Sequence, residues 1–130
     1  MNDALLLDTH TFLWWVTDFD RITPVADAQI RAAERVYVSA ASAWEIRAKF
    51  RLGKLPEAAA FVGALAGEVA RNGFRALPVG FDDGDLAGSF AAAHKDPFDR
   101  MLAAQAINHR LALVSNDPAL DAFGVVRVWS

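Results

Sequence analysis

The chain contains no cysteine among its 130 residues. This absence excludes a disulfide-stapled scaffold, a zinc site built on thiolates and a thiol nucleophile, and it suits a reducing compartment. An excess of one charge is also missing, since 13 basic side chains stand against 16 acidic ones and the net charge is −3. This balance argues against a protein that coats nucleic acid by bulk positive charge.

Long apolar runs are absent as well. The apolar run at residues 4–7 is interrupted by Asp8 and has no basic leader, so we expect no signal peptide. No stretch approaches the roughly 18 apolar residues that a membrane-spanning helix requires. We therefore expect a cytoplasmic protein that makes no membrane contact.

The chain is rich in residues that build a core. Hydrophobic residues make up 54% of it and include four Trp and nine Phe, which argues against disorder. Its length fits one domain, and no repeat or linker rich in Pro, Gly or Ser divides it. We predict a single domain that spans residues 1–130.

Short apolar runs alternate with helical patterns along the whole chain. The patterns predict strands at residues 4–7, 36–39, 74–79, 111–115 and 125–129. They predict helices at residues 9–16, 42–52, 57–71, 85–93, 98–109 and 118–122. This alternation is typical of an α/β protein with a parallel sheet and helices on both faces. In such sheets, ligands bind beyond the carboxyl ends of the strands.

Four acidic residues can reach that edge. Asp8 directly follows the first strand, and Asp117 lies two residues beyond the fourth. Glu45 lies one turn into the helix after the second strand, and Asp99 lies in the first turn of a later helix. Converging carboxylates repel one another, and Mg²⁺ or Mn²⁺ removes that repulsion while accepting oxygen ligands. Two such ions about 3.5–4 Å apart can clamp the attacking and leaving oxygens of phosphodiester hydrolysis.

Each acidic residue also has a structural interpretation. Asp96 and Asp117 both precede proline, a pattern that indicates a helix cap, and Asp8 could cap the first helix. Glu45 could form an ion pair with Lys49 four residues on. We take Asp96 as structural and leave the other three open. The three histidines show no zinc-ligand spacing, so a metal site here would consist of oxygen ligands.

Four segments carry the acidic residues, at residues 5–15, 39–46, 96–106 and 115–117. They read LLLDTHTFLWW, SAASAWEI, DPFDRMLAAQA and SND. In order and spacing these segments resemble PIN-domain ribonucleases of the VapC toxin type, and the third is the most specific. Ser115 stands where Thr is commoner in that family.

The resemblance implies a PIN-like three-layer α/β/α sandwich around a mostly parallel sheet of four to five strands. It implies a metal-dependent endoribonuclease that cleaves RNA as the toxin of a toxin–antitoxin pair, is inhibited by a cognate antitoxin and forms a homodimer. Carried over to this chain, Asp8 and Asp99 are direct ligands of one or two Mg²⁺ or Mn²⁺ ions. Glu45 and Asp117 complete the acidic quartet, and the Ser115 hydroxyl fixes a water or a carboxylate.

Binding of RNA also requires positive charge near the acidic residues, because phosphate contacts supply most of the affinity. Arg47, Lys49 and Arg51 lie close to Glu45 in the sequence, and Arg100 follows Asp99 directly. We expect these four basic residues to contact the substrate. A solvated helix face explains each of them singly.

Other functions remain open. A PIN-fold domain could bind RNA or a partner without turnover. A Mg²⁺-dependent phosphatase of the haloacid dehalogenase type needs a second Asp two residues after Asp8, where this chain has His10. A receiver-like signalling domain needs a Lys near its fifth strand, and no Lys follows Lys95.

Overall fold

The computed structural model describes residues 2–130. At its centre lies a five-stranded sheet of β1 (Ala4–Leu7), β2 (Arg35–Ser39), β3 (Arg75–Leu77), β4 (Ala112–Val114) and β5 (Arg127–Val128). The strand order is β3-β2-β1-β4-β5, and each neighbouring pair is parallel. The α/β class and the parallel sheet predicted from the sequence are confirmed.

Six α-helices and three short 3₁₀ helices connect the strands within the described residues. The α-helices are α1 (Thr9–Thr17), α2 (Pro24–Ala32), α3 (Ala40–Arg51), α4 (Leu65–Arg71), α5 (Phe81–Ser89) and α6 (Pro97–Asn108). The 3₁₀ helices are η1 (Phe19–Arg21), η2 (Pro56–Ala60) and η3 (Pro118–Phe123). None of the helices in residues 2–130 has the length and apolar character needed to cross a bilayer.

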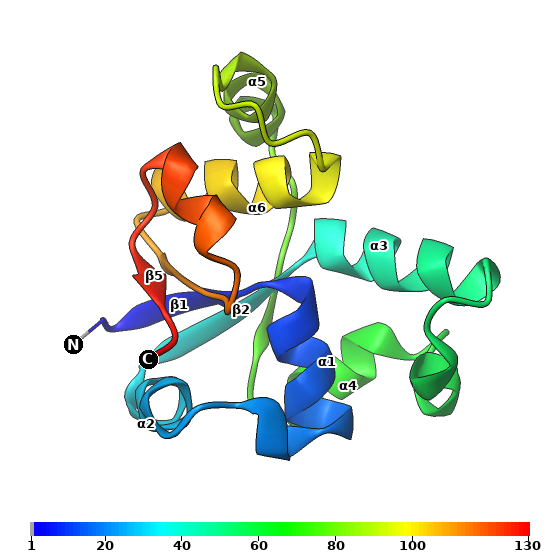
Figure 1. The fold of residues 1–130 in the computed structure, drawn as a ribbon. Helices are drawn as coiled ribbons and strands as arrows, with labels where there is room; N and C mark the ends of the chain where they lie inside the picture. Colours follow the sequence, from blue (N-terminus) through cyan, green and yellow to red (C-terminus); the bar gives the residue numbers. More distant parts are fainter. Residues whose placement is uncertain (1) are drawn as a thin grey trace.

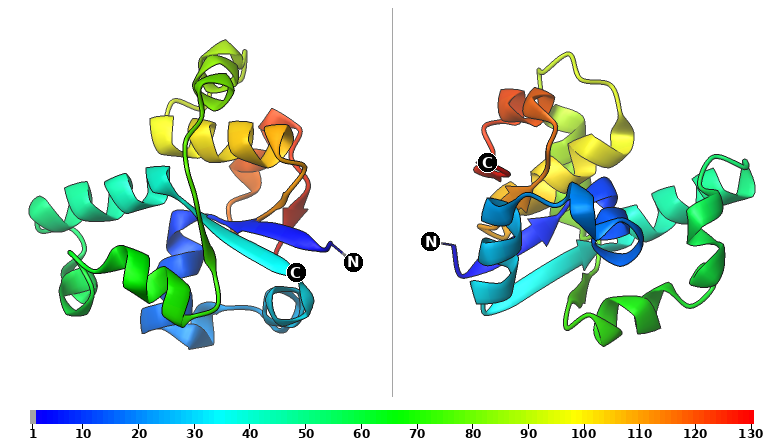
Figure 2. Two further views of the ribbon diagram at one scale, coloured as in Figure 1. Left: turned by 180° about the vertical axis from the view of Figure 1, so that it is seen from behind. Right: turned by 60° about the horizontal axis from the view of Figure 1, so that its bottom comes forward.

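The helices form a layer on each face of the sheet (Figure 1). Leu5 and Leu7 of β1 pack with apolar residues of α1, α2, α3 and α4 on one side. Ala4 and Leu6 pack with α6 and η3 on the other. This alternation follows from the two-residue period of a strand and confirms the three-layer α/β/α arrangement. Figure 2 shows from behind that the chain after β3 runs up to α5, which packs against α6 on the outside of that layer.

The central strand β1 determines where the chemistry can gather. All four of its residues are buried, as expected for a strand covered on both faces. Leu7 pairs with Val38 of β2 and with Val114 of β4. The next residues along these strands are Asp8, Ser39 and Ser115. They therefore reach the same carboxyl edge of the sheet.

Three helices differ from the prediction. The Ala-rich stretch at residues 57–71 is not one helix but η2 and α4, because Gly63 between them has φ +88°, in the left-handed region that ends helices. Helix α2 was not predicted, although its cap and proline pattern indicate a helix start: the Thr23 hydroxyl accepts the Ala26 N–H, and Pro24 follows. Helix α5 begins at Phe81, four residues before the predicted start at residue 85.

Candidate active site at the carboxyl edge of the sheet

A cavity of about 640 Å³ opens beyond the carboxyl ends of the central strands. All four acidic residues predicted from the sequence line it. A fifth carboxylate, Asp96, joins them, and the cavity lining also includes Lys49, His10 and His94. Parallel strands thus bring together acidic residues that are spread over most of the chain.

Asp8 combines a capping role with a place in this cavity. Only 6% of the residue is exposed, and its Oδ1 accepts the Thr11 N–H at 2.8 Å, so it caps α1. Burial raises the pKa of the Asp8 carboxyl above its usual value, while hydrogen bonds with Ser115 and Thr11 act in the opposite direction. The capping interpretation is therefore confirmed. It does not exclude a ligand, because the cap uses one carboxylate oxygen.

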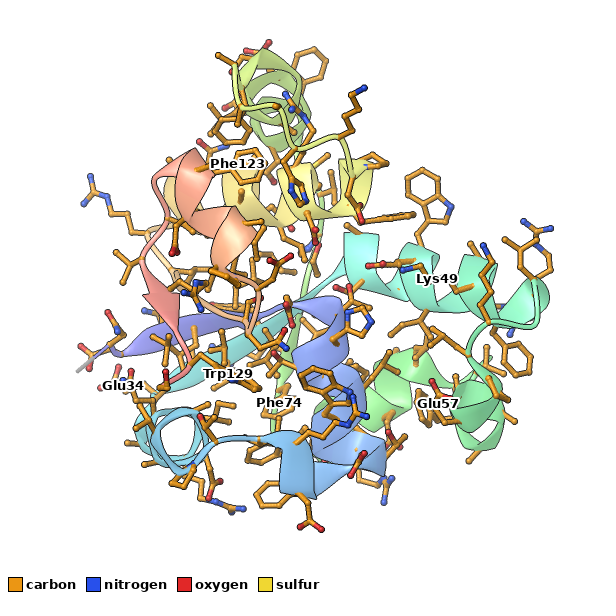
Figure 3. The ribbon with its side chains drawn as sticks, viewed as in Figure 1. Glu34, Lys49, Glu57, Phe74, Phe123 and Trp129 are labelled. Carbon is orange, nitrogen blue, oxygen red and sulfur yellow. The ribbon has the colours of Figure 1, made fainter. Side chains whose placement is uncertain are left out.

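Glu45 lies in the second turn of α3 and is 4% exposed. Its Oε2 is in direct contact with the Lys49 ammonium, so the predicted ion pair exists. The pair lies inside the cavity rather than on a solvated helix face, and Lys49 projects from α3 at this point (Figure 3). A hydrogen bond of 2.8 Å between the Thr9 and Ser42 hydroxyls ties α1 to α3 beside it.

Asp99 faces the cavity from the first turn of α6. Asp96 caps this helix by accepting the N–H groups of Phe98 and Asp99 at 2.9 and 3.3 Å, which confirms its structural role. Burial raises the pKa of the Asp99 carboxyl, a contact with His94 lowers it, and the like charges of Asp96 and Asp8 raise it further. The carboxylates of Asp8 and Asp99 are thus close enough to repel each other.

Asp117 and Ser115 complete the edge. Asp117 caps η3 by accepting the Ala119 N–H at 2.9 Å. The Ser115 hydroxyl is fully buried at the end of β4, where it accepts the Asp117 N–H at 3.1 Å and lies close enough to Asp8 to lower the pKa of that carboxyl. Ser115 therefore links two of the acidic residues.

The donor chemistry of this cavity suits a hard divalent cation. Within residues 2–130, no three His, Asp or Glu side chains are already gathered around one point closely enough to hold an ion. The oxygen donors and the mutual repulsion of Asp8 and Asp99 nevertheless fit Mg²⁺ or Mn²⁺, since a cation between them offsets both burial and repulsion. Lys49 contacts Glu45 Oε2 and His94 contacts Asp99 Oδ2, so one oxygen of each carboxylate already faces a nitrogen of a neighbouring side chain.

The basic residues expected to contact substrate lie in different environments. Lys49 lines the cavity, whereas Arg47 and Arg51 are exposed on α3 outside its lining. Arg100 points elsewhere, because its guanidinium donates to the backbone carbonyls of the segment that precedes α6. The structure therefore does not support the expected substrate contact of Arg100.

His94 is a site residue that the sequence did not reveal. Its Nε2 lies 2.8 Å from Asp99 Oδ2, and the residue lines the cavity. The segment at residues 90–96 has neither helix nor strand, so no periodicity could place this ring. Its spacing of five residues from Asp99 was the only trace of the contact in the sequence.

Comparisons with known proteins agree with this architecture. Residues 5–126 match the family model of the PIN domain. A comparison with curated proteins found no match. Among solved structures, the chain is similar to VapBC2 from Rickettsia felis bound to a promoter DNA fragment, with a TM-score of 0.67 and 10% identity over 98% of this chain and 99% of that one.

Two further structures are similar over most of their length. DNA-bound VapBC from Salmonella typhimurium gives a TM-score of 0.65 and 19% identity over 97% of this chain and 93% of that one. A toxin–antitoxin complex from Klebsiella pneumoniae gives 0.55 and 16% over 87% and 86%. At these identities the similarity concerns the fold. The family match covers nearly the whole chain, and the chain belongs to the PIN domain family.

Proposed function

We propose that this chain is a metal-dependent endoribonuclease that acts as the VapC-type toxin of a toxin–antitoxin pair. The observation that carries the proposal is the convergence of Asp8 and Asp99, with Glu45 and Asp117, on one cavity of a PIN domain. The similar structures add support, because one is a toxin–antitoxin complex and two are VapBC assemblies bound to DNA.

In this proposal Asp8 and Asp99 would hold the first ion. Glu45 and Asp117 would complete the coordination shell of a second ion or hold the waters bound to it. Mg²⁺ or Mn²⁺ bound there supplies Lewis acidity to a water and to the phosphodiester oxygens. The cap of α1 fixes Asp8 through Oδ1, so the carboxylate would bind the ion from a fixed position. Ser115 fixes Asp8 and Asp117 relative to each other from the end of β4.

Lys49 supplies positive charge inside the cavity. It neutralises Glu45 in the metal-free protein. With a metal ion bound to Glu45, the Lys49 ammonium would be available to a phosphate oxygen of the RNA, where it would support the affinity that phosphate contacts provide. Arg47 and Arg51 extend this charge along α3 and are proposed as more distant contacts.

The proposal includes two protein partners. A cognate antitoxin inhibits the enzyme, and a second copy of the chain forms a homodimer. Both rest on the resemblance to VapC toxins, and the antitoxin is supported by the complexes among the similar structures. The residues 1–130 act as one PIN domain in each subunit.

The decisive experiment incubates the purified protein with total cellular RNA and maps the new ends. We expect cleavage with Mg²⁺ or Mn²⁺, loss of cleavage in EDTA, and recovery when either ion is restored, because the ion would supply the Lewis acidity that the proposed mechanism requires. Full activity in EDTA would contradict the metal mechanism. RNA binding without new ends in any buffer would favour a PIN domain that binds without turnover.

A further inference from the structure

The segment at residues 90–96 joins α5 to α6 and borders the cavity without forming a helix or strand. The guanidinium of Arg100 contacts its backbone at three points. It donates to the carbonyls of Phe90, Ala92 and His94 at 2.7, 3.1 and 2.9 Å, and to Ala87 in the last turn of α5 at 3.0 Å. Four hydrogen bonds from one side chain thus fix the path of an otherwise irregular segment.

The path of this segment places the His94 ring next to Asp99. The ring places Nε2 at 2.8 Å from Asp99 Oδ2. On its other side it meets the edge of Phe123, with ring centroids 5.6 Å apart and planes at 81°. Phe123 belongs to η3, which packs beside α6 (Figure 3). The ring is therefore held by the segment backbone and by an aromatic contact, not by its hydrogen bond alone.

We propose that Arg100 and His94 are positioning residues for Asp99: Arg100 fixes the segment that carries His94, and His94 holds one Asp99 oxygen so that the other remains available to the cavity. The tighter metal binding that follows from this positioning rests on the proposed function. The positioning of Asp99 rests on the contacts among Arg100, His94 and Asp99.

The position of Asp99 needs such support. Its carboxylate lies near the like charges of Asp96 and Asp8, which raise its pKa. The contact with His94 gives Oδ2 a fixed partner at 2.8 Å and so limits rotation of the carboxylate. A metal ion bound in the cavity would meet a carboxylate that is already oriented, and oriented ligands bind metal more tightly.

Arg100 suits this task because of the geometry of its guanidinium. The planar group offers five N–H donors in a fixed fork, and four of them are engaged here. Within residues 2–130 it forms no ion pair, and its charge is stabilised by the carbonyl oxygens and by the Phe90 ring, whose centroid lies 5.9 Å from the guanidinium carbon. A lysine keeps the charge but cannot reproduce the fork, which makes Arg100→Lys the informative substitution.

The first test measures Mn²⁺ affinity of the full chain by titration calorimetry. We expect Arg100→Lys and His94→Leu each to weaken Mn²⁺ binding about tenfold or more, the range found when partners of metal ligands are removed. His94→Gln retains a side-chain donor and should recover part of the loss. Arg31→Lys serves as a matched control, because Arg31 pairs with Asp27 on α2, which does not contribute to the cavity lining.

The second test asks whether Arg100 acts through His94. In a His94→Leu background, adding Arg100→Lys should cause little further loss of Mn²⁺ affinity, since the residue that Arg100 positions is gone. Losses that multiply would overturn the inference and assign Arg100 an independent role. An RNA affinity that falls in Arg100→Lys, with unchanged Mn²⁺ affinity, would overturn it in favour of a phosphate contact.

A metal-free measurement separates this inference from the proposed function. The His94 ring signals in the NMR spectrum of the metal-free chain should shift or broaden in Arg100→Lys and stay unchanged in Arg31→Lys. Unchanged His94 signals in a folded Arg100→Lys variant overturn the inference, whatever the wild-type protein does with metal. Wild-type protein that binds no Mn²⁺ and cuts no RNA contradicts the proposed function instead. If Arg100→Lys fails to fold, the His94→Leu and His94→Gln pair still decides whether His94 supports the site.

Discussion

Two regions of the molecule bury aspartates, and they treat the negative charge in opposite ways. In the cavity, burial raises the pKa values of Asp8 and Asp99, and the like charges of Asp96 and Asp8 raise that of Asp99 further. At the junction of α5 and α6, burial pushes the pKa of Asp83 upward, but hydrogen bonds from Asn108 and Gly80 and the proximity of His109 outweigh it, so that pKa is lowered. In the cavity, hydrogen bonds offset the effect of burial only in part, whereas at the junction the partners of Asp83 outweigh it.

The junction shows what a structural aspartate looks like in this fold. Asp83 is 2% exposed, and its two oxygens accept the Gly80 N–H at 2.8 Å and the Asn108 amide at 3.0 Å. The carboxylate thereby ties the start of α5 to the end of α6. Burial alone therefore does not identify a functional acidic residue; burial together with uncompensated charge does.

The largest expected effect concerns the cavity. We predict that Asp8→Asn or Asp99→Asn lowers RNA cleavage at least about 100-fold, because losing a direct ligand costs more than the roughly 10–100-fold loss caused by removing a partner of a ligand. The fold should survive, since Asn caps a helix about as well as Asp at position 8, and Asp99 lies within the first turn of α6 rather than at its cap. Cleavage rates with Mn²⁺ and circular dichroism of each variant check this. Wild-type rates in either variant would remove the distinction between the two regions.

The junction should respond in stability rather than activity. Asp83→Ala leaves the Asn108 amide and the Gly80 N–H without their acceptor, so we predict a loss of about 1–3 kcal/mol in the free energy of unfolding. Cleavage per folded molecule should stay at the wild-type rate. Urea unfolding and cleavage assays on the same samples check both parts. A loss of cleavage comparable to that of Asp8→Asn would break the comparison.

The smallest expected effect is a difference in how the free energy of unfolding depends on pH, measured in EDTA. Because the pKa of Asp8 is raised in the folded state, ionised Asp8 destabilises the protein as the pH rises from its usual value of 3.8 through the raised value. The free energy of unfolding of Asp8→Asn should therefore exceed that of the wild type at pH 7, and the two should be equal at a pH below both pKa values of Asp8.

The contribution of Asp83 to the free energy of unfolding should change with pH in the opposite direction. Its lowered pKa gives stability that is fully present above the usual value of 3.8 and lost as the pH falls through the folded-state value. The destabilisation caused by Asp83→Asn should accordingly shrink in acid. Unfolding curves at pH 3 and pH 7 check both variants, and pH effects of the same sign would contradict the contrast between the two regions.

The sequence was informative where short-range patterns decide the structure. The apolar run of β1 and the cap of α6, with Asp96 followed by Pro97, depend on neighbouring residues and are found as predicted. The break at Gly63 was missed because an Ala-rich composition favours a helix, while the left-handed φ depends on how η2 packs beneath α3.

The candidate site was predictable in part for the same reason. Acidic residues that follow parallel strands must meet at one edge, and the cavity contains the four that were predicted. The capping and ion-pair alternatives for Asp8 and Glu45 could not be resolved in advance. Both interpretations hold together in the structure, because a carboxylate has two oxygens and the Lys49 contact lies inside the cavity.

The sequence by itself determined the alternation of strands with helical segments, and with it the parallel sheet, the edge where Asp8 and Asp99 meet and the absence of cysteine chemistry. These features follow from local periodicity, caps and composition, which act over a few residues. Only the tertiary structure decided which buried aspartates have partners, and that Arg100 holds the backbone next to His94. Those outcomes depend on distances across an irregular segment and between packed helices, and no local pattern encodes them.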